Sequence, residues 1–281
     1  MSLPLRPELY SLSGDEAAFF KSETGIEDDD ELKSHILTVQ AEAYKIRPYP
    51  CIRIFSFMRL KISRHPSYQR FLAIGRKRKD AIYAEIGCCF GNDVRKAVVD
   101  GFPVNQIIAT DLHPEFWTLG HRLFKSTPDS FPARFIAADV FQCLSADNTP
   151  VNTPISEIQS LGQLRGHISA IHTAAVFHLF NEEQQLQLGK IMAILLSSTP
   201  GSMIFGTHIG LPTKGHREEP VALGGRTHCM FCHSPETWRS LWDGGIFPKG
   251  AVDVEVSLKE LDRPDLAGAK FYMLVWCITV L

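Results

Sequence analysis

Short apolar segments alternate with helix-length amphipathic segments along the chain after residue 80. We expect strands at 81–86, 106–110, 133–138, 168–172 and 202–207, with helices at 93–100, 114–123 and 182–197. Strands that alternate with helices are typical of a parallel, doubly wound sheet that is covered on both faces. The alternation therefore predicts an α/β fold with a Rossmann-like sheet.

The two ends of the chain depart from this alternation. Residues 252–258 and 271–280 are predicted strands without a full helix between them, which indicates an antiparallel C-terminal hairpin that closes a seven-stranded, mostly parallel sheet. The first eighty residues are predicted to be helical, because apolar residues fall on one helical face in 32–43 and further short helices follow. We therefore expect an N-terminal helical cap at 1–80 and a sheet domain at 81–281.

The composition disfavours several classes of function. The chain has 281 residues, 44% of them hydrophobic, which is enough for a large core. A formal net charge of -2 gives no reason to expect nucleic acid or an anionic membrane as partner. We find no apolar stretch of about 20 residues and no signal-peptide pattern. With 7 cysteines, an odd number, we expect a cytoplasmic protein in a reducing compartment.

Three acidic residues mark the ends of successive predicted strands. Glu85 ends the first strand and leads into a turn with Gly87 and Gly91, while Asp111 and Asp139 end the second and third strands. Ligands of doubly wound sheets bind at the carboxyl ends of the strands. Asp111 is placed to accept hydrogen bonds from both hydroxyls of a ribose, and Asp139 from the amine of an adenine. The pattern predicts a nucleoside-containing cofactor.

A nicotinamide cofactor is the competing interpretation. It requires G-x-G-x-x-G, but Cys89 and Asn92 stand where the second and third glycines belong. Asp93 would also place negative charge against the phosphates of such a cofactor. A sulfonium cofactor carries no phosphate and benefits from Glu85, so these electrostatics favour it.

These motifs resemble those of class I S-adenosylmethionine-dependent methyltransferases. In that family the first acid and the glycine turn hold the amino-acid end of the cofactor, the second acid holds the ribose, and the third contacts adenine. The family's middle glycine is Cys89 in this chain. The resemblance and the strand order together imply these cofactor-binding residues: Glu85, Gly87, Cys88, Gly91, Asp111, Leu112, Asp139, Val140 and His172.

Four further segments, 23–26, 49–55, 87–95 and 233–238, look like those of fungal secondary-metabolite methyltransferases. The resemblance is strongest to meroterpenoid-pathway enzymes that esterify a carboxyl group on a prenylated aromatic polyketide. It implies a small hydrophobic acceptor and a possible homodimer. It also implies that 228–233 is a loop before the helix at Trp238 and lines the substrate pocket.

The substrate-side candidates are His178 and Arg53. His178 follows the fourth strand, over the expected methyl position, and can act as a base; a structural histidine is the alternative. Arg53 can pair with a substrate carboxylate, or it can form a surface ion pair. The run His228-Cys229-x-x-Cys232-His233 contains metal-capable residues, but it lacks a second Cys pair, so we predict no metal.

Methylation of a carboxyl group is the primary functional prediction, since a carboxylate acceptor is already ionised near pH 7 and needs no base. A phenol or alcohol O-methyltransferase would need one. Two further hypotheses keep the fold: a cyclase or isomerase that uses the sulfonium only for its charge, and a non-enzymatic binding protein.

Overall fold

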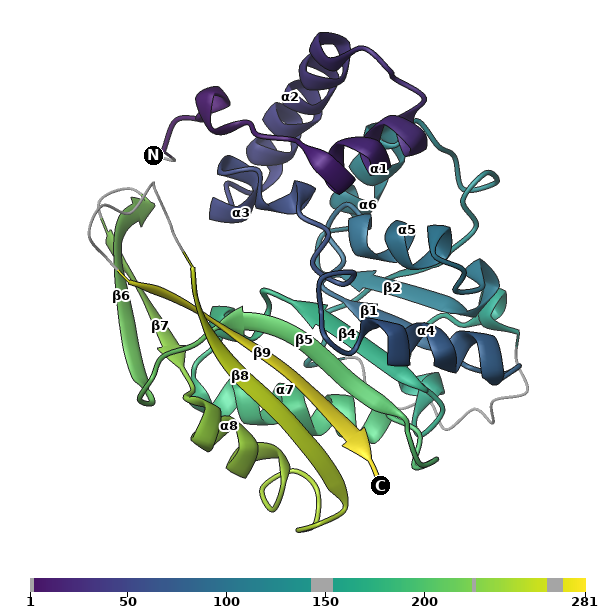
Figure 1. Ribbon diagram of the computed structural model, residues 1–281, viewed down its shortest axis with the longest axis vertical. Coiled ribbons are helices and arrows are strands. Elements are labelled where there is room, and N and C mark those ends of the chain that lie inside the picture. Colours follow the sequence, from purple (N-terminus) through teal and green to yellow (C-terminus); the bar gives the residue numbers. More distant parts are fainter. Residues whose placement is uncertain (1–2, 143–153, 224–225, 262–269) are drawn as a thin grey trace.

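The computed structural model describes residues 3–142, 154–223, 226–261 and 270–281 (Figure 1). The strands are β1 Tyr83–Ile86, β2 Ile107–Asp111, β3 Arg134–Ala137, β4 Ala170–Ala174, β5 Met203–Ile209, β6 Gly215–Leu223, β7 Arg226–Cys232, β8 Val252–Leu261 and β9 Phe271–Val280. The α-helices are α1 Gly14–Thr24, α2 Asp29–Ile46, α3 Pro50–Arg53, α4 Tyr68–Lys77, α5 Asn92–Val99, α6 Pro114–Leu123, α7 Glu182–Leu195 and α8 Pro235–Trp242. Short 3₁₀ turns include η2 Ser56–Met58 and η6 Phe177–Leu179.

Seven strands form one sheet in the order β3-β2-β1-β4-β5-β9-β8. The first five strands pair in parallel, and β9 lies antiparallel between β5 and β8. In the register of β1 and β4, Glu85 lies opposite His172. The predicted Rossmann-like sheet with an antiparallel C-terminal pair and N-terminal helices is confirmed.

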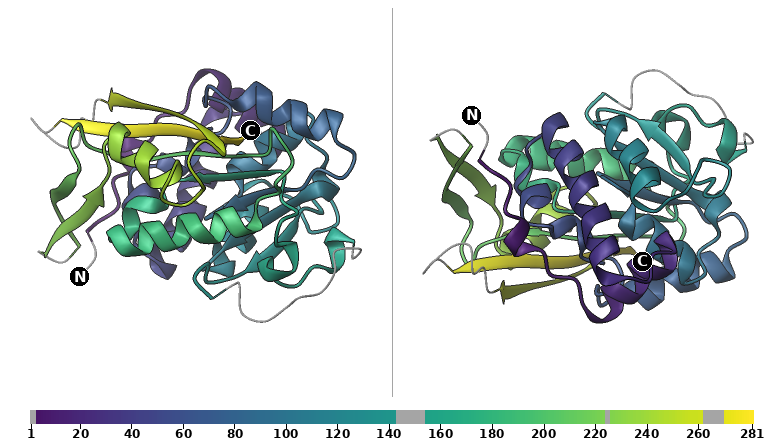
Figure 2. Two further views of the ribbon diagram at one scale, coloured as in Figure 1. Left: turned by 90° about the horizontal axis from the view of Figure 1, so that it is seen from below. Right: turned by 90° about the horizontal axis from the view of Figure 1, so that it is seen from above.

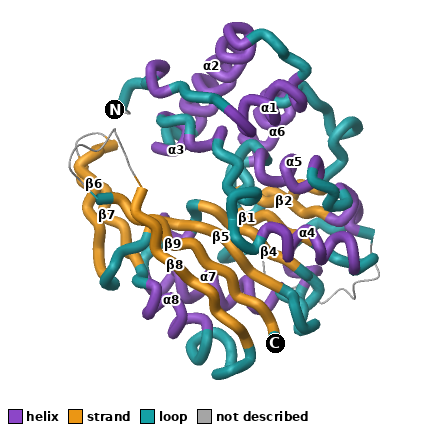
Figure 3. Tube along the Cα trace, viewed as in Figure 1, coloured by secondary structure: helices purple, strands orange, loops and turns teal. Residues whose placement is uncertain are grey.

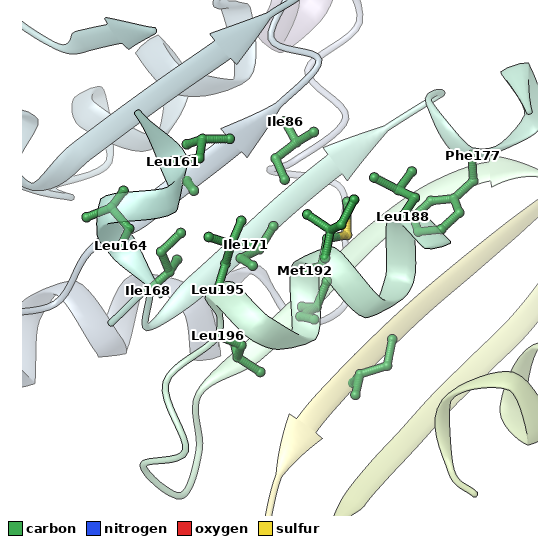
Figure 4. Close-up of a cluster of buried hydrophobic side chains, with 14 of the residues drawn as sticks. Ile86, Leu161, Leu164, Ile168, Ile171, Phe177, Leu188, Met192, Leu195 and Leu196 are labelled. Atoms are coloured by element: carbon green, nitrogen blue, oxygen red, sulfur yellow. The ribbon is translucent and has the colours of Figure 1, made fainter. Parts of the chain in front are cut away.

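Helices cover both faces of the sheet (Figure 2). Side chains alternate between the faces along each strand, so β1 sends Ala84 and Ile86 to one face and Tyr83 to the other. The first face packs on α7 and α8, where Leu188 and Met192 are fully buried (Figure 4). Each such buried aliphatic side chain stabilises the fold by about 1.5–3 kcal/mol. The second face packs on α4, α5 and Trp117 of α6.

A third apolar cluster joins the N-terminal helices to the sheet domain. Residues of α1 and α2 such as Phe20 and Ile36 pack against Phe90 of the glycine turn and Phe116 of α6. Figure 3 shows α1, α2 and α3 gathered with α6 at one end of the molecule. Helix α4 belongs to the cluster on the second sheet face instead. The division at residue 80 stays a prediction.

The segment that we expected to be a loop at 228–233 is a strand through Cys232, and this prediction was wrong. Strands β6 and β7 form a separate antiparallel hairpin. Its first strand is hard to recognise in the sequence because Gly215, His216 and Arg217 open β6 without the apolar alternation that reveals a half-buried strand. Within the described ranges, no helix is long and apolar enough to cross a bilayer.

Candidate active site

The turn from β1 into α5 is anchored on the neighbouring strand. The backbone N–H groups of Gly87 and Cys88 both donate to the carbonyl of Thr110, at 2.9 and 3.0 Å. Gly87 has a φ of +76°, and a Cβ there would lie 2.5 Å from Cγ2 of Val176. Gly91 also has a φ of +76°, and its Cβ would lie 2.7 Å from the Trp117 ring. Both positions therefore require glycine.

Cys89 occupies the left-handed region although it is not glycine, with a φ of +50°. Such a conformation costs about 1–2 kcal/mol for an ordinary residue. The Cys89 N–H donates to Oδ2 of Asp111 at 2.9 Å, and this charge-assisted hydrogen bond holds the turn in place. Cys89, in place of the family's middle glycine, thus keeps the geometry of the turn but holds its own backbone in a strained conformation.

Asp111 receives backbone hydrogen bonds on both carboxyl oxygens. Oδ2 accepts from Cys89, and Oδ1 accepts from His113 at 3.0 Å. Burial raises the pKa of Asp111, and these two hydrogen bonds act against the rise. Each oxygen keeps a second lone pair, so the carboxylate is oriented and still able to accept from a vicinal diol. Leu112 beside it is 59% exposed.

Asp139 follows β3 and stays partly exposed. Its Oδ1 accepts from the Phe141 N–H at 3.0 Å, and its Oδ2 accepts from the Gln142 side chain at 3.1 Å. The neighbouring Val140 packs against the first-face cluster. The Ala138 N–H bonds to the carbonyl of Asp111 at 3.1 Å, which ties the ends of β2 and β3 together.

Glu85 points into the second face of the sheet and is only 3% exposed. Its Oε2 accepts a hydrogen bond from the Tyr83 hydroxyl and lies 2.7 Å from Nδ1 of His172, which is fully buried. Asp93, in the first turn of α5, completes the group: one ligand atom from each of Glu85, Asp93 and His172 lies within 4.8 Å of the others. His172 therefore meets Glu85 directly.

Burial disfavours the charged forms of Glu85 and His172, although the two groups lie at ion-pair distance. Burial raises the pKa of Glu85 to about 8, although the Tyr83 hydrogen bond lowers it. Burial also lowers the pKa of His172 to about 4. Both shifts therefore act against the charged forms of the pair. A cation that arrives beside Glu85 would favour its ionised form.

The two substrate-side candidates lie on different elements, His178 in η6 and Arg53 in α3. His178 in η6 is near the fully buried His208 of β5, whose pKa is lowered first by burial and then by His178 and His233. Arg53 in α3 donates through Nε to the carbonyl of Pro4 at 2.8 Å, so it ties down the N-terminal segment.

A hollow of about 490 Å³ opens between α1, residues 60–69 and α5. Glu23, Tyr68 and Lys96 are among the residues that line it. None of the three strand-end acids does, so this hollow is separate from the site built on Glu85, Asp111 and Asp139.

Two contributors to the site were not assigned from the sequence. Tyr83 precedes Glu85 by two residues, and the two-residue period of a strand places both side chains on one face. This spacing is visible in the sequence and could have identified Tyr83 as a neighbour of Glu85. Asp93 was assigned to the helix start and to the argument against phosphate, but its proximity to Glu85 and His172 depends on how α5 packs.

The donor set fits S-adenosylmethionine. Carboxyl groups stand at the three strand ends, where they can meet an ammonium, a ribose diol and an exocyclic amine. The glycine turn offers no phosphate cradle, because Asp93 lies in the first turn of α5.

Known proteins resemble this chain over most of its length. Residues 5–58 match the sequence model of the meroterpenoid methyltransferase N-terminal domain. The O-methyltransferase phiE of a fungal species (strain ATCC 74256) is 32% identical over 227 residues, covering 81% of this chain and 69% of that protein. The asnovolin E/chermesin D methyltransferase nvfJ of Aspergillus novofumigatus is 32% identical over 253 residues, covering 89% and 83%.

A solved structure, a Burkholderia thailandensis 1,6-didemethyltoxoflavin-N1-methyltransferase, superposes with a TM-score of 0.47 at 12% identity, covering 78% of this chain and 80% of that chain.

The seven-stranded sheet, the strand-end acids and the relatives define an S-adenosylmethionine-dependent methyltransferase of class I. The chain belongs to the family of fungal secondary-metabolite methyltransferases that phiE and nvfJ represent.

Proposed function

We propose that this enzyme methylates a carboxyl group of a small hydrophobic secondary metabolite, a prenylated aromatic polyketide of a meroterpenoid pathway. The observation that carries the proposal is the likeness, over 89% of the chain, to a methyltransferase named for asnovolin E and chermesin D. The match of residues 5–58 to a meroterpenoid methyltransferase domain supports the same substrate class.

Three buried histidines near the sheet, His172, His208 and His233, are poor candidates for a base, which favours an acceptor that is already ionised. Burial lowers the pKa of His172 and of His233 to about 4 and also lowers the pKa of His208, so these side chains are weak bases. An acceptor carboxylate has a pKa of about 4 and needs no proton removed at neutral pH. A phenol acceptor, with a pKa of about 10, does need a base.

The roles of the chain are then to bind, orient and exclude water. The cofactor supplies an electrophilic methyl group on a sulfonium. Asp111, fixed by two backbone N–H groups, binds the ribose, Asp139 binds the adenine amine, and Glu85 faces the amino-acid end. The cap packs against Phe90 of the glycine turn through the third apolar cluster and shields the reacting atoms from water. Alignment of the acceptor oxygen with the methyl group supplies the rate enhancement.

The test uses one acceptor that offers both oxygens, a farnesylated hydroxybenzoic acid, with S-adenosylmethionine labelled in the methyl group. The expected product is a methyl ester, which alkali hydrolyses to the starting acid, formed together with an equal amount of S-adenosylhomocysteine. A label that resists alkali would mark an ether and refute carboxyl methylation. A changed acceptor without S-adenosylhomocysteine would indicate a cyclase or isomerase.

Two variants test the substrate-side residues. Replacing a general base typically lowers the rate about 10²- to 10⁴-fold, so His178→Gln should have a much smaller effect if the acceptor is a carboxylate. Arg53→Lys removes the planar fork that pairs with carboxylates and should raise the KM of the acceptor while leaving kcat unchanged. An unchanged KM would show that Arg53 does not bind the acceptor carboxylate.

A further inference from the structure

Two hydrogen bonds anchor η2 and the loop that follows it on the first turn of α5. The Ile62 N–H donates to Oδ1 of Asp93 at 3.0 Å, and the Asn92 side chain donates to the carbonyl of Phe57. Lys61 directly precedes one of these anchored residues and is half-buried. Its backbone is therefore fixed beside the end of the glycine turn.

The positive charge of Lys61 acts on the groups of the active site. Burial is the main reason that the pKa of Glu85 is raised, and the charge of Lys61 acts against this rise. The same charge acts on the pKa values of Asp93 and Cys89, which are raised mainly by burial. Coulomb interactions weaken with distance, and the anchored backbone at Ile62 brings this stretch of the loop close enough for the Lys61 charge to reach these groups.

Among the described residues, Lys61 has no fixed counter-ion. Within the part of the chain that the structure describes, its ammonium forms no ion pair, although Glu85, Asp93 and His172 form a compact buried group close by. A half-buried cation of this kind is available to pair with an anionic ligand group.

The amino-acid end of S-adenosylmethionine carries an ammonium and a carboxylate on the same carbon. The acids Glu85 and Asp93 complement the ammonium, but a carboxylate among them would be repelled. Removing a carboxylate from water is costly unless a cation or hydrogen-bond donors replace the lost solvation. Lys61 is a half-buried cation on the loop that leads from the N-terminal helices into α4.

We propose that Lys61 binds the α-carboxylate of the methyl donor and so makes the site specific for nucleosides that carry the intact amino-acid chain. The proposal rests on S-adenosylmethionine as the donor and is independent of which acceptor oxygen is methylated. It predicts that Lys61 increases the affinity only for ligands that have this carboxylate.

The experiment compares two ligands by titration calorimetry: S-adenosylhomocysteine, and 5′-methylthioadenosine, which lacks the amino-acid carbons. Lys61→Met should weaken the binding of S-adenosylhomocysteine about 10- to 100-fold, as expected for the loss of a charge-assisted hydrogen bond. It should change the affinity for 5′-methylthioadenosine by less than about twofold. Lys61→Arg should restore most of the affinity. Lys79→Met, at an exposed lysine, is the matched control and should behave like wild type.

Asp111→Ala provides the contrasting pattern: both ligands contain the ribose, so this variant should bind both of them more weakly. Equal weakening of both ligands by Lys61→Met would show a general loss of the site and overturn the proposal. So would unchanged binding of both, or a rise confined to the KM of the acceptor. An ether product in the acceptor assay would refute carboxyl methylation and leave these binding results standing.

Discussion

Replacing Glu85 by glutamine should alter how the stability of the free protein depends on pH. Glu85 is 3% exposed, and burial raises its pKa from an ordinary 4.5 to about 8. A carboxyl whose pKa is higher in the folded state binds its proton more tightly there, so it stabilises the fold at low pH. This contribution is lost as the pH rises through the folded-state value.

The magnitude follows from these two pKa values. The linked free energy is RT ln[(1 + 10^(8−pH))/(1 + 10^(4.5−pH))], which is about 2.7 kcal/mol near pH 6 and about 0.4 kcal/mol near pH 8. Wild type should therefore lose about 2 kcal/mol more than Glu85→Gln between these conditions. The titrating groups that do not contact Glu85 are common to both proteins and cancel in the difference.

The assay is urea unfolding at about pH 6 and about pH 8, without cofactor, followed by tryptophan fluorescence. Glu27→Gln, at an exposed glutamate, is the control and should keep the wild-type dependence on pH. Parallel pH dependences for wild type and Glu85→Gln would refute the reasoning, because they would mean that Glu85 is ionised in the folded protein throughout this range.

Three further predictions concern the glycine turn and the metal-capable group. Gly87→Ala should destabilise the protein by about 2–4 kcal/mol in urea unfolding, because its Cβ would lie 2.5 Å from Val176 at a positive φ; a loss below about 1 kcal/mol would contradict this packing. Cys89→Gly should be neutral within about 1 kcal/mol and Cys89→Val should destabilise by about 2 kcal/mol in the same assay, since only a side chain is strained at a φ of +50°; equal effects would argue against that φ. Removing divalent cations with EDTA should leave methyl transfer unchanged, whereas a loss restored by a divalent ion would assign a metal to Glu85, Asp93 and His172.

The sheet could be predicted from the sequence because its strands are short, apolar and separated by helices. The predicted strand at 271–280 and the helix at 114–123 coincide with β9 and α6. The β6–β7 hairpin could not be predicted from the sequence, because its first residues are polar and because its pairing joins residues as far apart as Gly215 and Cys232.

The placement of the acids at strand ends could also be predicted, but not what their side chains contact. Asp111 was expected to be open to a ligand, and it is in addition held by two backbone N–H groups. The loop that carries Lys61 bonds to Asp93, 31 residues further along the chain, and no local pattern reveals such a contact. Roles of individual residues in binding stay predictions.

The pairing of Glu85 opposite His172 also bears on how the sheet assembles. A slip of one residue between β1 and β4 would turn His172 to the opposite face and bring Thr173 or Ile171 to its place. Glu85 would then be buried beside an apolar side chain or a hydroxyl, without its imidazole. A buried polar group without its partner costs about 1–3 kcal/mol. The active-site pair therefore discriminates against misregistered sheets during folding, before any ligand has bound.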